Sequence, residues 1–205
     1  MRVSKEQSET NRTSLLQAAG RLFKEKGFDG VGVAEVAKEA GLTHGALYAH
    51  FPSKDALAAE AFSDGIAHRL TAMRGRKWTF EKYLDAMFSI EHRDNLANGC
   101  PMTASASEIA RQGTAVAASF ARAFKDTATV LEESIEGEMS AAQKRHLAIS
   151  ALAAQIGAIA VARAVAEVDP SFSKEVLRSV RETVTPQLPA KGIKAKKSRL
   201  QRSTK

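Results

Sequence analysis

Residues 33–51 read VAEVAKEAGLTHGALYAHF. The first half of this stretch places apolar residues at the spacing of one helical face: Val33, Val36, Ala37 and Ala40. Gly41 ends this short helix, and Thr43 is a good N-cap for the helix that follows. Pro52 disfavours the helical conformation in the residue before it, so the second helix must end near Phe51. The stretch therefore predicts two short helices joined by a three-residue turn.

Two short helices joined in this way make a helix-turn-helix, in which the second helix enters the major groove of DNA and the first crosses the phosphate backbone. Gly41 allows the tight turn, and Thr43 binds free amide groups at the start of the second helix. An ordinary pair of core helices has the same turn. The turn alone therefore leaves DNA recognition and simple core packing both open.

The sequence around the turn extends the pattern through these segments: Gly27-Phe28-Asp29, residues 33–43, Gly45-Ala46-Leu47-Tyr48 and residues 51–57. Together they resemble the DNA-binding region of the TetR family of repressors. The resemblance covers about residues 9–60, and its Tyr, Phe and Lys fall at the family's spacing after a first helix that ends in Gly. Past residue 60 the similarity lies mainly in the number and length of the helices.

The resemblance implies roles for the residues around the second helix. Three of them would contact phosphates, which positions a protein on DNA without selecting a sequence: Thr43, Tyr48 and Lys54. Five would face base edges: His44, Gly45, Ala46, Ala49 and His50. Leu47 and Phe51 are better explained as core residues that hold the second helix on the first.

The sequence departs from the family pattern in two respects. Gly32 stands where the family usually has Thr or Ser, and it supplies no hydroxyl for a phosphate. The second helix also has no Arg or Lys at the positions that face the bases. Because a bidentate cation is the usual reader of guanine, we expect an operator whose core is rich in A·T pairs.

The whole chain predicts an all-α fold, since no run of alternating β-branched and aromatic residues lies between turn signals. Periodicity and caps predict about nine helices, over residues 9–26, 33–40, 44–50, 54–70, 79–92, 101–111, 114–135, 141–168 and 170–185. We expect an N-terminal three-helix helix-turn-helix domain over residues 1–55 and a C-terminal helical ligand-binding and dimerisation domain over residues 56–188.

A basic tail follows these domains over residues 189–205. Residues 190–205 contain seven positive and no acidic side chains, which accounts for the whole net charge of +7. Such a composition cannot bury apolar area and predicts disorder. The tail could add non-specific attraction to phosphates or act only as a solubilising segment.

The predicted helix over residues 141–168 is apolar on more than one face and must therefore be buried on several sides. The resemblance implies that it forms, with the last helix, a four-helix contact with a second copy of the chain. Candidate interface residues are Leu147, Ala151, Ile156, Ile159, Val165, Phe172, Val176 and Val180. The core of a monomer is the alternative. A dimer would place two recognition helices about 34–36 Å apart, facing successive major grooves of a palindromic operator.

The middle helices would enclose a pocket for a small hydrophobic effector. Its candidate lining is aromatic, Met-rich and apolar: Phe62, Ile66, Trp78, Phe80, Tyr83, Met87, Phe88, Cys100, Met102, Phe120 and Phe124. Residues of these types at helical spacing also make plain core. An effector that binds only one spacing of the two recognition helices would shift the equilibrium away from DNA.

Cys100 suggests a second mechanism. It lies directly before Pro101, near the start of a helix, where the helix dipole stabilises a thiolate. The sequence here is similar to TetR-type regulators that sense electrophiles. Cys100 could therefore be a redox or electrophile sensor, or only a small buried hydrophobe.

Other classes of protein have less support. Residues 149–166 could be tested as a membrane span, but they are Ala-rich and Arg163 would be costly in lipid. Residues 1–14 are polar, without a signal-peptide core, which favours a cytoplasmic protein. The five His residues are scattered and no Gly-rich phosphate loop is present, so we expect no enzyme activity, no cofactor and no metal. An architectural DNA-binding protein without a regulatory role is the remaining alternative.

Overall fold

The computed structural model describes residues 4–185, and the predicted tail over residues 189–205 lies outside them. The described residues form ten helices and no strand. In chain order the helices are α1 (Lys5–Lys26), α2 (Val33–Glu39), α3 (His44–His50), α4 (Lys54–Gly75), α5 (Phe80–Met87), α6 (Ile90–Asp94), α7 (Pro101–Ile109), α8 (Thr114–Ser134), α9 (Ala141–Val165) and α10 (Pro170–Val184). The all-α prediction is confirmed.

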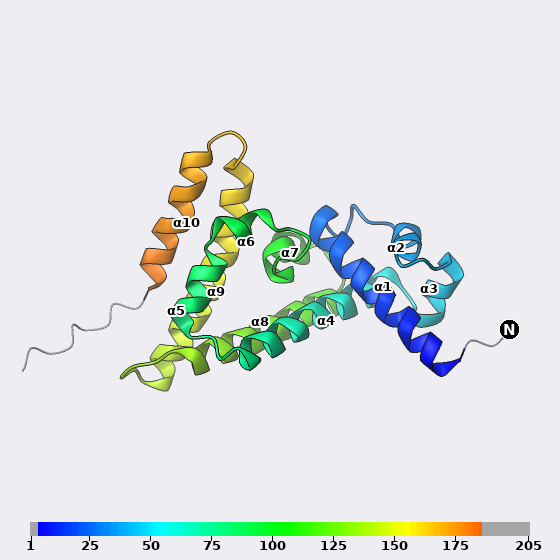
Figure 1. The fold of residues 1–205 in the computed structure, drawn as a ribbon, viewed down its shortest axis with the longest axis horizontal. Helices are drawn as coiled ribbons and strands as arrows, with labels where there is room; N and C mark the ends of the chain where they lie inside the picture. Colours follow the sequence, from blue (N-terminus) through cyan, green and yellow to red (C-terminus); the bar gives the residue numbers. More distant parts are fainter. Residues whose placement is uncertain (1–3, 186–205) are drawn as a thin grey trace, which may run out of the picture.

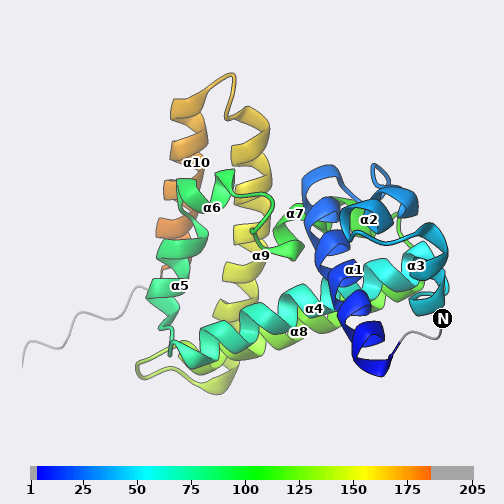
Figure 2. The same cartoon turned by 45° about the vertical axis from the view of Figure 1, so that its right-hand side comes forward.

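The helices form two groups (Figure 1). Helices α1, α2 and α3 pack together at one end of the molecule. In the second group α4 and α8 run side by side, while α9 and α10 form a separate upright pair (Figure 2). Helix α1 packs against α4 and α7 as well as against α2 and α3. It therefore joins the two groups.

The predicted helix over residues 79–92 is wrong, because the structure has two helices there and hence ten rather than nine in its described part. Phe88 leaves the helical conformation with φ −98° and ψ 19°. The hydroxyl of Ser89 accepts a hydrogen bond from the amide of His92 at 3.0 Å and so begins α6. A serine side chain can replace a backbone acceptor in this way, which interrupts a helix that apolar periodicity alone would continue.

Other caps lie where the sequence predicts them. Thr43 accepts a hydrogen bond from the amide of Ala46 at 3.2 Å, and Ser53 caps α4 in the same way. Ser140 forms a full capping box with Gln143 at the start of α9. Each of these caps satisfies amide groups that a helix start leaves without partners. They fix the helix starts that position the candidate site.

Helix α9 crosses the core of the C-terminal group. It is long enough to span a membrane, and an 18-residue window of it is apolar enough, with a mean hydropathy of 1.7. Core helices of globular proteins meet the same criterion, and α9 packs against α6, α7, α8 and α10. Its buried face includes Gln155, which is 0% exposed. Gln155 accepts a hydrogen bond from the hydroxyl of Tyr83 at 2.5 Å and donates one to the hydroxyl of Thr103 at 3.0 Å.

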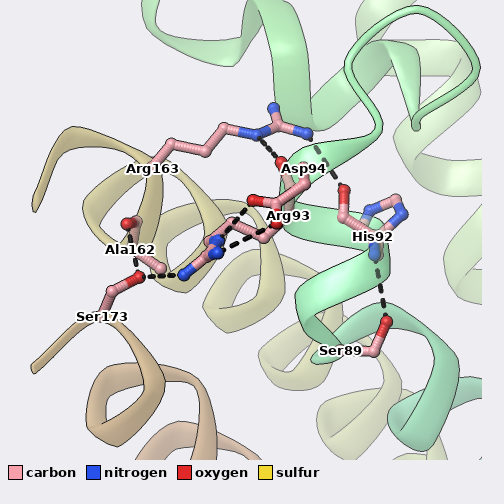
Figure 3. Close-up of polar contacts among 7 residues, drawn as sticks. All are labelled: Ser89, His92, Arg93, Asp94, Ala162, Arg163 and Ser173. Atoms are coloured by element: carbon pink, nitrogen blue, oxygen red, sulfur yellow. Dashed lines mark hydrogen bonds and ion pairs between the residues drawn. The ribbon is translucent and has the colours of Figure 1, made fainter. Parts of the chain in front are cut away.

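A cluster of polar contacts fixes α6 to α9 and α10 (Figure 3). Arg163 of α9 donates hydrogen bonds to the backbone carbonyls of Arg93 at 2.6 Å and His92 at 3.2 Å. Arg93 donates to the hydroxyl of Ser173 at 2.8 Å, and Ser173 donates in turn to the carbonyl of Ala162 at 2.7 Å. Arg163 therefore contributes polar contacts inside the fold, which explains a charged residue on this apolar helix.

His92 makes the stability of this cluster depend on pH. Burial, reinforced by the positive charges of Arg69 and Arg163, lowers the pKa of His92 to about 4. An unfolded His titrates near 6.5, so between these values the unfolded state binds the additional proton. Stability is therefore lost as the pH falls through this window, by about 2 kcal/mol between pH 7 and pH 5. Denaturant unfolding at fixed protein concentration measures this loss.

Two variants identify His92 as the cause. His92→Leu should remove most of the difference between pH 7 and pH 5, since the titrating group is gone. His68→Gln changes a histidine whose side chain is 77% exposed and should leave the difference as it is in the parent. Equal pH dependence in the parent and in His92→Leu would contradict the prediction.

Candidate nucleic-acid interface

The turn between α2 and α3 is tight and fixed by backbone hydrogen bonds. Gly41 has φ +69°, a conformation that glycine adopts without steric cost. The amide of Gly41 donates to the carbonyl of Lys38 at 3.0 Å, and the amide of Leu42 donates to the carbonyl of Ala37 at 2.8 Å. These bonds satisfy carbonyls at the end of α2. The turn therefore sets the direction in which α3 begins.

The inner side of α3 is anchored in the N-terminal core. Leu47 and Phe51 are both 0% exposed, as expected for residues that hold this helix in place. The guanidinium of Arg12 from α1 lies 5.0 Å from the centre of the Phe51 ring. Arg12 also forms an ion pair with Glu60 of α4. Helix α3 is thus held by contacts that involve both α1 and α4.

The outer side of α3 carries the residues predicted to contact DNA. Five of them are exposed: Thr43, His44, Gly45, Tyr48 and Ala49. Three are partly buried at the edge of this surface: Ala46, His50 and Lys54. The structure brings all eight together on α3 and its two flanks, at the end of the molecule opposite α9 and α10. That they contact DNA stays a prediction.

Two side chains give this surface a defined shape. Tyr48 is 47% exposed, and its ring meets that of His44 edge to face with 5.0 Å between ring centres. A Cβ atom added at Gly45 would have no neighbour within 4 Å, so α3 can approach another surface closely at this point. Gly32 caps α2 without a side-chain hydrogen bond, in line with the missing hydroxyl noted in the sequence.

Sequence reasoning missed a contact that joins the two helix groups behind this surface. The carboxylate of Glu108 in α7 accepts a hydrogen bond from the backbone amide of Phe28 at 2.8 Å. Gly27 has φ +75°, and a side chain there would collide with the same carboxylate. Gln112 donates to Asp29 at 3.3 Å nearby. Gly27 at the end of a helix was the only local signal, since Glu108 lies 80 residues from its partner.

The predicted effector pocket is not one open cavity in this structure. Ile66, Tyr83, Cys100 and Met102 do meet, around a cavity of about 10 Å³. This is room for about one water molecule. Four of the predicted lining residues are buried elsewhere in the core: Phe62, Phe80, Met87 and Phe88. Three others are only partly buried against the core: Trp78, Phe120 and Phe124. Large apolar side chains fill the space between the middle helices because they pack against one another.

The predicted dimer residues fall into two sets. Ala151 and Ile159 are 0% exposed within the chain itself, so they are core residues and that part of the prediction is wrong. The helical pattern shows burial but does not show which neighbour buries a residue. Phe172 is 46% exposed. The other predicted residues are partly buried: Leu147, Ile156, Val165, Val176 and Val180. Exposed apolar residues that the prediction omitted lie on or beside α9: Ile149, Val161 and Val168.

Cys100 is the N-cap residue of α7, as its position before Pro101 predicts, and it is only 3% exposed. Its sulfhydryl makes no cap hydrogen bond. It lies beside the small cavity that Tyr83 and Met102 also line. A reagent could reach the sulfur only through a local opening of the fold, because the cavity is far smaller than an organic molecule.

Helix α3 is short, follows a tight turn after α2 and packs against α1 and α2. This arrangement defines a helix-turn-helix protein. Residues 15–61 match the family model of bacterial regulatory proteins of the tetR family. The match covers the helix-turn-helix region of the chain and the helices that frame it.

Relatives share sequence over short stretches of the chain. The regulator AcrR of Shigella flexneri is 39% identical over 59 residues, which are 29% of this chain and 27% of AcrR. The regulator LmrA of Bacillus subtilis is 44% identical over 55 residues, which are 26% of this chain and 29% of LmrA. The match thus spans less than a third of the length of either relative.

Solved structures share the whole fold. The TetR family regulator from Cytophaga hutchinsonii has a TM-score of 0.65 at 22% identity, covering 90% of this chain and 96% of its own. The reduced form of NemR from E. coli has a TM-score of 0.65 at 20% identity, covering 87% of this chain and 99% of its own. FadR of Bacillus subtilis, solved with stearoyl-CoA, has a TM-score of 0.58 at 16% identity, covering 86% and 99%. At these identities the likeness establishes the fold.

Proposed function

We propose that the protein is a sequence-specific transcription regulator that binds a palindromic operator as a homodimer and represses until a small hydrophobic effector releases it. The observation that carries this proposal is the exposed outer side of α3, which lies inside the region that matches the family model. In this proposal Tyr48, Thr43 and Lys54 contact phosphates. His44, Gly45, Ala46, Ala49 and His50 face the bases.

The homodimer is supported by exposed apolar residues on α9, on α10 and in the turn between them. Phe172, Val161 and Ile149 are between 39% and 48% exposed, and Val168 is 85% exposed. Exposed large apolar side chains that gather on neighbouring helices are a common mark of a protein interface. A second copy would cover them, and twofold symmetry would then present two α3 helices to a palindrome.

The effector would have to open the core between α4, α5, α7 and α8, where the cavity of about 10 Å³ is far too small for it. Ligand pockets of proteins usually measure about 300–1,000 Å³. Binding would therefore move helices apart. A movement of α7 would also displace Glu108, whose carboxylate binds the amide of Phe28. The stearoyl-CoA complex of FadR, a protein of the same fold, supports an effector with an apolar part.

The two alternatives make different demands. Electrophile sensing through Cys100 requires attack on a thiol that is 3% exposed, so burial argues for slow reaction and for a core role. An architectural role requires DNA binding without site preference. The defined arrangement of Tyr48, His44 and Gly45 on α3 favours binding to a preferred site instead. We also propose that the protein acts in the cytoplasm, without enzyme activity, cofactor or metal.

The test is a genome-wide selection of DNA fragments bound by the purified protein at physiological salt, repeated with Tyr48→Ala. We expect the parent to enrich one palindromic site and Tyr48→Ala to lose at least tenfold in affinity for it, since about 1.4 kcal/mol of phosphate contact corresponds to that factor. Tyr48 is half-exposed, so its removal should leave the melting temperature nearly unchanged. Salt-sensitive binding with no preferred site would contradict the proposal.

A further inference from the structure

An open groove lies where α1, α2, α4 and the loop after α6 meet. Its volume is about 560 Å³, which is within the usual range of ligand sites. A recess of about 40 Å³ lies between α1, α4 and α7. Four residues border both spaces: Gly20, Lys24, Ala61 and Gly65. We call the groove and its recess together the junction groove, because they lie between the two helix groups.

The recess of the junction groove is apolar. Phe23 and Phe28 form one side, with their ring centres 5.2 Å apart, and Phe62 lines it from α4. Gly20 leaves space beside them, since a Cβ atom there would meet only the carbonyl of Ala61 at 3.9 Å. The hydroxyl of Ser105 also lines the recess, but it already donates to the carbonyl of Pro101 at 2.7 Å. The recess therefore suits an apolar group.

One charged group of the junction groove has no counter-ion. Arg21 forms an ion pair with Glu39, and Asp64 lies 3.3 Å from Nδ1 of His68. Lys24 is half-buried and forms no ion pair with any residue that the structure describes. Burial, followed by the positive charge of Arg69, lowers its pKa from the ordinary value. An anion placed beside this ammonium group would offset both effects.

We propose that the junction groove binds a small amphipathic monocarboxylate, with the end of its apolar chain in the recess, the rest of the chain along the groove and its carboxylate against Lys24. A single ammonium group matches a single negative charge. Glu39 and Asp64 also line the groove, and they would repel the second charge of a phosphate group. The site is separate from the small cavity beside Cys100, which is lined by other residues.

The position of the site connects it to DNA binding. Phe28 lines the recess, and its backbone amide is the group that Glu108 of α7 binds. A ligand that contacts α1, α4 and α7 at once changes the packing between the helix-turn-helix and the body behind it. This regulatory effect rests on the proposed function, whereas binding of the carboxylate does not.

The experiment uses decanoate as the probe and decanol as its neutral counterpart, titrated calorimetrically into the full-length protein without DNA. We expect saturable binding of decanoate to the parent. Lys24→Met should weaken decanoate at least tenfold and leave decanol unchanged. Gly20→Leu fills the recess and should weaken both compounds at least tenfold. Lys26→Met is the matched control: this neighbouring lysine pairs with Glu35 outside the groove and should not matter.

Absence of saturable decanoate binding to the parent would overturn the proposal. Equal binding by the parent and by Lys24→Met would do the same, even if Gly20→Leu failed to fold. The effect on DNA is measured separately, as the change in affinity for the selected fragment when decanoate is added to the parent and to Lys24→Met. If the protein binds no DNA at all, the proposed function fails and the calorimetric result still decides the binding site.

Discussion

Gly45→Glu should reduce the affinity for the selected DNA fragment at least 100-fold while the protein remains folded. Gly45 is exposed in the first turn of α3, and a Cβ atom there has no neighbour within 4 Å. A glutamate in the first turn of a helix is favourable for the helix itself, because it faces the positive end of the dipole. On DNA the same carboxylate faces phosphates and base edges, where like-charge repulsion costs several kcal/mol. About 2.8 kcal/mol corresponds to the factor of 100.

Fluorescence anisotropy at fixed salt measures this affinity, and the melting temperature reports on folding. Gly75→Glu is the matched control, since Gly75 is an exposed glycine with open space at the far end of α4. It should bind DNA as the parent does. If the two variants bind equally well, the DNA surface is not the outer side of α3.

Gln155→Leu should lower the free energy of unfolding by about 3 kcal/mol, because it leaves two buried hydroxyl groups without their partner. The groups are those of Tyr83 and Thr103, which are 2% and 6% exposed. For a domain of this size the loss corresponds to a fall in melting temperature of roughly 6–12 °C. Chemical denaturation of the parent and the variant at equal concentration measures it.

A triple variant separates the polar network from simple packing. Combining Gln155→Leu with Tyr83→Phe and Thr103→Val removes the orphaned hydroxyl groups together with the amide, and this should recover more than half of the lost stability. Should the triple variant instead be less stable than Gln155→Leu, the amide acts by filling space and not through its hydrogen bonds. Burial also raises the pKa of Tyr83, so its hydroxyl remains a donor at any ordinary pH.

The helix-turn-helix could be predicted from the sequence because its signals are local. Gly41 has the left-handed φ that a turn of this kind requires, and Thr43 caps α3 with its own side chain. Pro52 ends α3 where the sequence rule places the end. Each signal acts within a few residues, so it can be detected without knowing what packs against the helix.

The remaining features depend on neighbours far along the chain. Apolar spacing marks Ile159 as buried but cannot tell the core of its own chain from a second copy. Ser89 interrupts a helix at a position where serine in other contexts would simply face solvent. The junction groove arises because α1, α4 and α7 meet, and the sequence around Lys24 does not show that this residue forms no ion pair within residues 4–185. Such features are found only when the helices are assembled.

The bond between Glu108 and the amide of Phe28 limits how the first three helices can be combined with the body of another protein. A chimera that joins these helices to the body of another protein of the same fold keeps Gly27 and the amide but loses the carboxylate that binds it. The body that receives these helices must therefore offer an acceptor at the position of Glu108. A hybrid made without one would leave the amide of Phe28 unsatisfied, and its first three helices would lose a fixed contact with the body behind them.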